Sequence, residues 1–158
     1  MSEEKREATF TMERLFAGFL GFVSKLIIEK HGEEGRQLIY DAMKKTGEYM
    51  AESYLNANKD AKKGLDGIIE YYGLETLPET MKLLERTESK YKLKISDCAY
   101  LKVWRDIDIL PVVPDICDMI AAFDDVVTGI FDPKIRLATP KAMGKGDDCC
   151  IYYYEKSE

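Results

Sequence analysis

The C-terminal third of the chain, residues 117–154, has the pattern of one helix–strand–turn–strand unit. An apolar helix stops near Gly129, Asp132-Pro133 turn the chain into a strand, and a Gly-Lys-Gly turn leads into the last strand. Three of the four cysteines and the pair Asp124-Asp125 fall inside this unit. Because so many reactive side chains are concentrated there, the unit predicts where a functional site would form.

The N-terminal part of the chain is predicted to be entirely helical. Hydrophobic residues recur at three- and four-residue spacing over residues 9–30, which is typical of a helix. His31-Gly32 end that helix, and a second helix follows with acidic residues in its first turn. We take residues 8–56 as this helical part. Gly18 and Gly21 interrupt the first helix, where they allow close helix packing or form the wall of a cavity or a dimer seam.

Short strands follow a short helix in the middle of the chain. Residues 81–87 and 91–95 are predicted strands, and in the second of them apolar residues alternate with lysines. A further helix begins at Cys98, and Asp97 is placed to cap it. Pro111 and Pro114 are expected to break the chain before the helix that carries Cys117.

The order of these elements predicts the fold class. The sequence contains no strand–helix–strand repeat of the parallel type, so we expect an α+β fold. In it the N-terminal helices pack with an antiparallel sheet of about four strands. We expect a single domain over residues 1–158, in which residues 80–156 form the α+β part that carries the cysteines and aspartates.

Charge and motif content exclude several classes of partner. The chain has 158 residues and a net charge of −6, without a basic stripe to replace the counterions of phosphates, so nucleic acid is not an expected partner. The turn at 144–148 lacks the following helix and the Lys-Ser/Thr of a phosphate-binding loop. No signal peptide is evident, and the apolar run 15–28 is short and contains Lys25, so we expect no membrane span and a cytoplasmic protein.

The cysteines are the first candidates for chemistry. Cys98 and Cys117 are expected at helix starts, where the helix dipole lowers the pKa of a thiol and makes it a better nucleophile or ligand. Cys149 and Cys150 are adjacent in a strand, so only one of them can face a shared site. Alternatively, each cysteine is a small buried apolar residue. Without a CxxC pair, the spacing leaves metal binding open, and the sequence names no cofactor.

The carboxylate pair is the second candidate. On one helix, Cys117 and Asp124 share a face, while Asp125 is displaced by about 100°. A carboxylate on an apolar face is a candidate general base or ligand anchor. The alternative is a hydrogen-bonded or solvated aspartate near a helix end.

Residues 98–154 resemble the L-2-amino-thiazoline-4-carboxylic acid hydrolase family. The matching pattern is a cysteine that opens a helix, a cysteine and aspartates on the next helix, a Pro-led strand and a Gly-Asp-x-x-Cys hairpin that places Cys150 at the motif position. The hairpin is also similar to the 4-vinyl reductase domain of small-ligand sensors, which is related in fold to transport-particle (TRAPP) subunits. Ala142 stands where a zinc ligand of such sensors is expected. The aromatic tail, Tyr152-Tyr153-Tyr154, departs from the pattern and suggests a different ligand or a subunit contact.

The resemblance implies hydrolytic opening of a small cyclic amidine. In that reaction water adds to the carbon between sulfur and nitrogen, and the thiolate leaves. The resemblance assigns the base to Asp124 or Asp125 and a nucleophile or metal ligand to Cys98 or Cys117. Arg136 or Lys141 is the candidate anchor for a substrate carboxylate. The alternative is a non-catalytic domain that binds or senses a small molecule.

The resemblance also predicts the location of the site, and the apolar stripe of the first helix predicts a partner. We expect Cys98, Cys117 and Cys150 around one pocket edge, with Asp124 one step deeper. The apolar stripe of the first helix, which includes Phe16, Phe19, Phe22 and Val23, is wider than one neighbour can cover. We therefore expect a homodimer built on the N-terminal helices, with a small molecule as the other partner.

Overall fold

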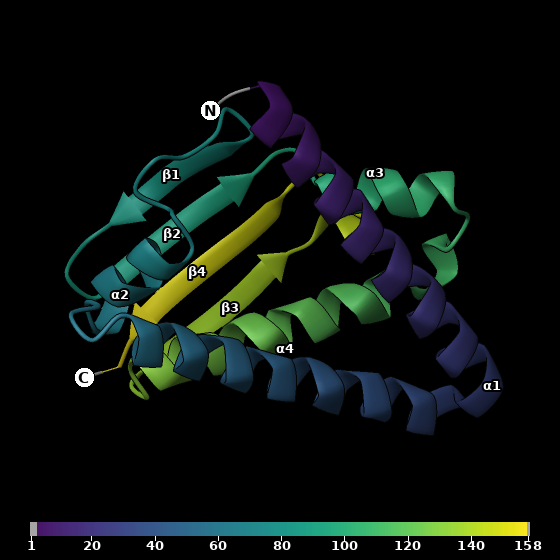
Figure 1. Ribbon diagram of the computed structural model, residues 1–158, viewed down its shortest axis with the longest axis horizontal. Helices are drawn as coiled ribbons and strands as arrows, with labels where there is room; N and C mark the ends of the chain where they lie inside the picture. Colours follow the sequence, from purple (N-terminus) through teal and green to yellow (C-terminus); the bar gives the residue numbers. More distant parts are fainter. Residues whose placement is uncertain (1–2, 158) are drawn as a thin grey trace.

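The protein folds into four helices and a four-stranded sheet (Figure 1). The computed structural model describes the backbone of residues 3–157 and the side chains of residue 12 and residues 14–157. The elements are α1 (Glu3–Ala57), α2 (Gly64–Tyr71), β1 (Met81–Arg86), β2 (Lys90–Ile95), α3 (Ala99–Asp106), η1 (Leu110–Val112), α4 (Val113–Phe131), β3 (Ile135–Lys141), η2 (Met143–Lys145) and β4 (Cys150–Lys156). The strands pair antiparallel in the order β1-β2-β4-β3. The predicted α+β class is therefore confirmed.

Helix α1 is bent sharply at Gly32. Gly32 has φ 57° and ψ −127°, a conformation that glycine adopts far more readily than residues with a side chain. The bend divides α1 into two legs, residues 3–31 and 33–57, which form a V over the rest of the molecule (Figure 1). The sequence predicted the position of this break, and the structure shows that the two helical segments form a V.

Two hydrophobic clusters hold the helices to the sheet. The first joins the first leg of α1, α3 and the start of α4 around Leu20, Trp104 and Ile116. The second joins α2, the end of α4 and the sheet around Ile68, Val127 and Leu93. A Cβ at Gly21 would lie 2.4 Å from Ile109 Cδ1, so this glycine serves the close packing that was one of its predicted roles.

Two helix starts differ from their predicted positions. The Cys98 side chain itself caps α3 by accepting from the Leu101 N–H, while Asp97 pairs with Lys102. Helix α4 begins at Val113, four residues before Cys117. The prediction that Pro114 breaks the chain was wrong, because proline in the first turn of a helix has no required N–H bond to lose.

The sheet presents one face to the helices. Tyr91 and Leu93 of β2 pair with Tyr154 and Tyr152 of β4 on that face, and Tyr91, Leu93 and Tyr154 are buried. Lys92 and its partner Tyr153 occupy the opposite face. The alternation predicted for residues 91–95 is therefore confirmed.

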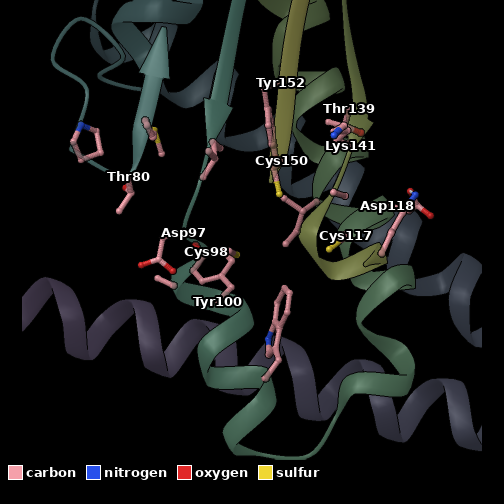
Figure 2. A pocket seen from close by; sticks show the side chains of 18 residues that line it. Thr80, Asp97, Cys98, Tyr100, Cys117, Asp118, Thr139, Lys141, Cys150 and Tyr152 are labelled. Atoms are coloured by element: carbon pink, nitrogen blue, oxygen red, sulfur yellow. The ribbon is translucent and has the colours of Figure 1, made fainter. Parts of the chain in front are cut away.

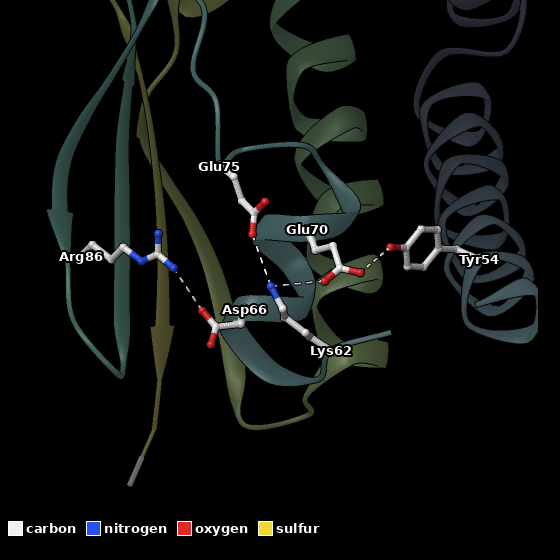
Figure 3. A network of polar contacts seen from close by, with 6 residues as sticks. All are labelled: Tyr54, Lys62, Asp66, Glu70, Glu75 and Arg86. Carbon is white, nitrogen blue, oxygen red and sulfur yellow. Dashed lines mark hydrogen bonds and ion pairs between the residues drawn. The ribbon is translucent and has the colours of Figure 1, made fainter. Parts of the chain in front are cut away.

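A polar network fixes α2 and the segment that follows it (Figure 3). Lys62 lies between Glu70 and Glu75, at 3.5 and 3.3 Å. Glu70 also accepts a hydrogen bond from Tyr54 of α1 (3.1 Å). Because the network holds both sides of the turn after α2, it positions Tyr72 next to the sheet.

None of the helices in the described part of the chain combines the length and the apolar character needed to cross a membrane.

Candidate functional site

Three cysteines line one pocket at one end of the sheet (Figure 2). Cys98 comes from the start of α3, Cys117 from α4 and Cys150 from the start of β4. The pocket, which we call the cysteine pocket, has a volume of about 410 Å³. Its other polar lining residues are Thr80, Asp97, Tyr100, Asp118, Thr139, Lys141, Lys145 and Tyr152.

Local structure fixes two of the three sulfurs. The Cys98 Sγ accepts from the Leu101 N–H (3.4 Å), and the Cys150 Sγ accepts from the Met143 N–H (3.3 Å). The third, Cys117, packs beneath the η2 turn, where a Cβ at Gly144 would lie 2.3 Å from its Sγ. Cys149 is buried and does not line this pocket, as expected for its position next to Cys150 in the chain.

Two thiols of this pocket, those of Cys117 and Cys150, have pKa values above that of a free thiol. Burial raises the pKa of Cys117 to about 11 and also raises the pKa of Cys150. The predicted lowering at Cys117 was wrong, because α4 begins four residues earlier and Cys117 lies beyond its first turn. At neutral pH both side chains are therefore protonated thiols.

The charged residues of the cysteine pocket are paired with one another or with neighbours. Lys141 lies 3.0 Å from Asp148, and Lys145 pairs with Asp118. Of the two predicted carboxylate anchors, only Lys141 lines the pocket. Arg136 instead donates to the backbone carbonyls of Pro133 and Ile135.

The two predicted aspartates lie outside the cysteine pocket. Asp125 Oδ1 accepts from the Leu137 N–H (3.2 Å) and so attaches β3 to α4. Asp124 is buried, and its Oδ1 accepts from the Tyr72 hydroxyl at 2.7 Å. Burial raises the pKa of Asp124 to about 7, against the opposing effect of hydrogen bonds from Tyr72 and Tyr152.

Asp124 lines a second and larger space, which we call the apolar cavity. It has a volume of about 920 Å³ and lies between the two legs of α1, α4 and the helix-facing side of the sheet. Its lining residues are Phe16, Phe19, Leu20, Val23, Ile27, Leu38, Ile39, Ala42, Met43, Thr46, Met50, Tyr72, Leu74, Met81, Leu93, Ile95, Tyr100, Ile120, Phe123, Asp124, Tyr152 and Tyr154. Among these described residues, Asp124 alone has a carboxyl group, and none is a lysine, arginine or histidine.

The apolar cavity adjoins the cysteine pocket. Five residues line both spaces: Met81, Ile95, Tyr100, Ile120 and Tyr152. The two spaces thus share part of their walls, and together they extend from the V of α1 to the start of β4.

The sequence matches a known family. The family model of L-2-amino-thiazoline-4-carboxylic acid hydrolase matches residues 12–154. The chain belongs to this family. No curated protein matches the chain.

Two solved structures share the fold. One is subunit 3 of a trafficking protein particle complex from Naegleria fowleri, covalently bound to palmitic acid; it is 10% identical, with TM-score 0.62 over 94% of this chain and 96% of that one. The other is the phenol-responsive sensory domain of the transcription activator PoxR with phenol; it is 14% identical, with TM-score 0.57 over 89% of this chain and 73% of that one. At these identities the likeness establishes a TRAPP-like fold and nothing finer.

The sequence did not predict that Tyr72 and Tyr152 lie next to Asp124. Tyr72 follows a short helix, and nothing in its local pattern indicates a contact with a residue on α4. In the sequence, Tyr152 was noticeable only as part of an aromatic tail.

Within the described part of this family member, no three His, Cys, Asp or Glu side chains are placed to hold a metal ion.

Proposed function

We propose that this family member binds a small apolar molecule in the apolar cavity. The observation that carries the proposal is the composition of the lining around about 920 Å³ of space: aliphatic and aromatic side chains with few polar groups. Ligand sites in proteins have this character, with a small number of polar groups that orient the ligand. Here those groups are Asp124 and the tyrosines around it.

The energetics favour occupation of the cavity by an apolar ligand. Side chains of the first leg that border the cavity are exposed, with Phe19 at 66% and Phe16 at 46%. Covering such surface contributes roughly 25 cal/mol per Å² removed from water. The two structural neighbours support this reading, since one is described with palmitic acid and the other with phenol.

Binding of the neutral apolar dye Nile red tests the proposal. We expect the dye to bind with a blue shift of its fluorescence. Ile120→Trp, which fills space within the cavity lining, lowers the affinity for the dye at least about tenfold. Leu84→Trp is the matched control, because it adds the same indole to an exposed position on β1 that does not line the cavity. Equal dye affinity in both variants, or no dye binding at all, contradicts the proposal.

The family match favours hydrolysis of a small cyclic amidine as a second candidate function. The cysteine pocket has the size for a small ring, and Lys141 is placed to bind a substrate carboxylate. The three cysteines are its candidate nucleophiles. The candidate bases in this pocket are Asp97 and Asp118, since Asp124 lies in the apolar cavity and Asp125 is bonded to the β3 backbone.

Incubation with 2-amino-thiazoline-4-carboxylate tests the second candidate. Ring opening adds one water to the substrate, and mass spectrometry detects the product directly. Cys98→Ser, Cys117→Ser and Cys150→Ser identify the thiol that the reaction needs, and Lys141→Met tests the anchor through KM. A rate equal to that of buffer alone excludes this activity.

A further inference from the structure

Among the side chains that the structure describes, none with a positive charge lines the apolar cavity beside Asp124. The described lining side chains from both legs of α1, from β1 and from β2 are uncharged. The ionisable groups that interact with the carboxyl are tyrosines: Tyr71, Tyr72, Tyr152 and Tyr154. Tyrosine hydroxyls donate hydrogen bonds, and the pKa of each of these four is raised, so all of them are neutral.

An uncompensated buried carboxylate is costly, and a ligand can remove the cost. Transfer of an unpaired charge from water into an apolar site is unfavourable, which is why burial raises the pKa of Asp124 to about 7. A ligand that brings a positive charge restores the pairing and forms a charge-assisted hydrogen bond, which is about twice as strong as a neutral one. The rings of Tyr72 and Tyr152, which line the same cavity, attract a cation as well.

We propose that the apolar cavity selects an apolar molecule with one protonated amine, and that Asp124 is the residue that pairs with the amine. This inference rests on the proposed binding function and adds the chemical class of the ligand. The apolar lining accommodates the hydrocarbon body, and the single carboxylate accommodates one cationic group. A ligand with a carboxylate in the same place would meet repulsion from Asp124, and an alcohol would leave the charge uncompensated.

Competition for Nile red with three matched probes tests this inference. Decylamine, decanol and decanoic acid share one chain and differ only in the head group. We expect decylamine to bind at least about tenfold more tightly than decanol at about pH 8. Since the amine stays protonated while Asp124 titrates, its advantage falls roughly tenfold between about pH 8 and pH 6.

Variants of Asp124 test whether the preference for the amine comes from its pairing with the carboxylate. Asp124→Asn removes the preference for decylamine over decanol. Asp115→Asn is the control, since it makes the same change on the same helix at a residue that pairs with Arg36 and does not line the cavity. Should Asp124→Asn fail to fold, Tyr72→Phe gives an independent readout. Loss of its hydrogen bond raises the pKa of Asp124, so the amine preference appears at higher pH.

The outcomes distinguish this inference from the function on which it rests. Equal affinities for decylamine and decanol, or an amine preference that survives Asp124→Asn, overturn the inference and leave apolar binding intact. Failure of Nile red and of all three probes to bind overturns the binding function itself.

Discussion

The Tyr72 hydroxyl lies 2.7 Å from Oδ1 of Asp124, which is 52 residues further along the chain. The bond joins the end of α2 to the middle of α4, at the wall of the apolar cavity. It stabilises a carboxylate whose burial is otherwise unfavourable, as the raised pKa of about 7 indicates. Protonation of Asp124 is therefore linked to the stability of the fold, and in the proposed function it is also linked to ligand binding.

The first prediction concerns stability and pH. The pKa of Asp124 rises from 3.8 to about 7 on folding, so the native state binds the proton more tightly than the unfolded chain. The stabilisation from this proton is present at low pH and is lost as pH rises towards 7, by up to about 1.4 kcal/mol per pH unit. Urea unfolding of the ligand-free protein between pH 5 and pH 8 measures the slope.

Asp124→Asn tests the origin of that slope. The amide cannot ionise and can still accept from Tyr72, so we expect the variant to be more stable than the wild type at about pH 8, by a smaller margin at about pH 5, and similar to it only below the unfolded-state pKa of 3.8. An unchanged slope in the variant would assign the pH dependence to other groups.

The second prediction concerns the bend of α1. Gly32 adopts φ 57° and ψ −127°, so Gly32→Ala introduces strain of about 1–3 kcal/mol. We expect lower stability in urea and weaker Nile red binding, because both legs of the V line the cavity. Gly18→Ala is the matched control. A Cβ there meets nothing within 4 Å, and alanine in a helix is favoured over glycine by about 1 kcal/mol, so stability rises.

The main elements of the fold were predictable because each had a local signal. Gly32 after an apolar helix marked the break, and the alternation of Tyr91, Leu93 and Ile95 with lysines marked the central strand. The start of α4 was not predictable in this way. Pro114 is equally compatible with a break and with a first helical turn, and only the packing of Val113 in the first cluster decides between them.

The candidate site was predictable only in part, because its two halves are joined by tertiary contacts. The family resemblance predicted that Cys98, Cys117 and Cys150 share one site, and these three residues line one pocket. The expectation that Asp124 lies deeper in the same site fails, since its position on α4 turns it towards the V of α1. Tyr72 reaches it through the fold alone, and no local pattern encodes such a contact.

The third prediction concerns thiol reactivity. With a pKa of about 11, the Cys117 thiol is ionised in about one molecule in a thousand at about pH 8. We expect iodoacetamide to alkylate Cys117 on the order of a hundredfold more slowly than an exposed cysteine. Peptide mass spectrometry measures the rate, and the urea-unfolded protein is the control in which the difference disappears. Rapid alkylation in the native state would instead indicate an activated nucleophile.

The fourth prediction is that α1 joins two copies of the chain. Met12, Leu15, Phe19, Phe22 and Leu26 follow one another at alternating spacings of three and four residues, and each is about half exposed or more. This spacing forms the seam of two-helix packing, and an apolar stripe of this kind is unfavourable on a monomer. We therefore propose a homodimer with twice the 18.1 kDa mass of the chain. Light scattering at micromolar concentration tests this mass.

The double variant Leu15→Glu with Leu26→Glu, at positions outside the cavity lining, is expected to convert the dimer to a monomer. Leu84→Glu on β1 is the control and is expected to leave the dimer intact. A wild-type monomer under these conditions would rule out this interface.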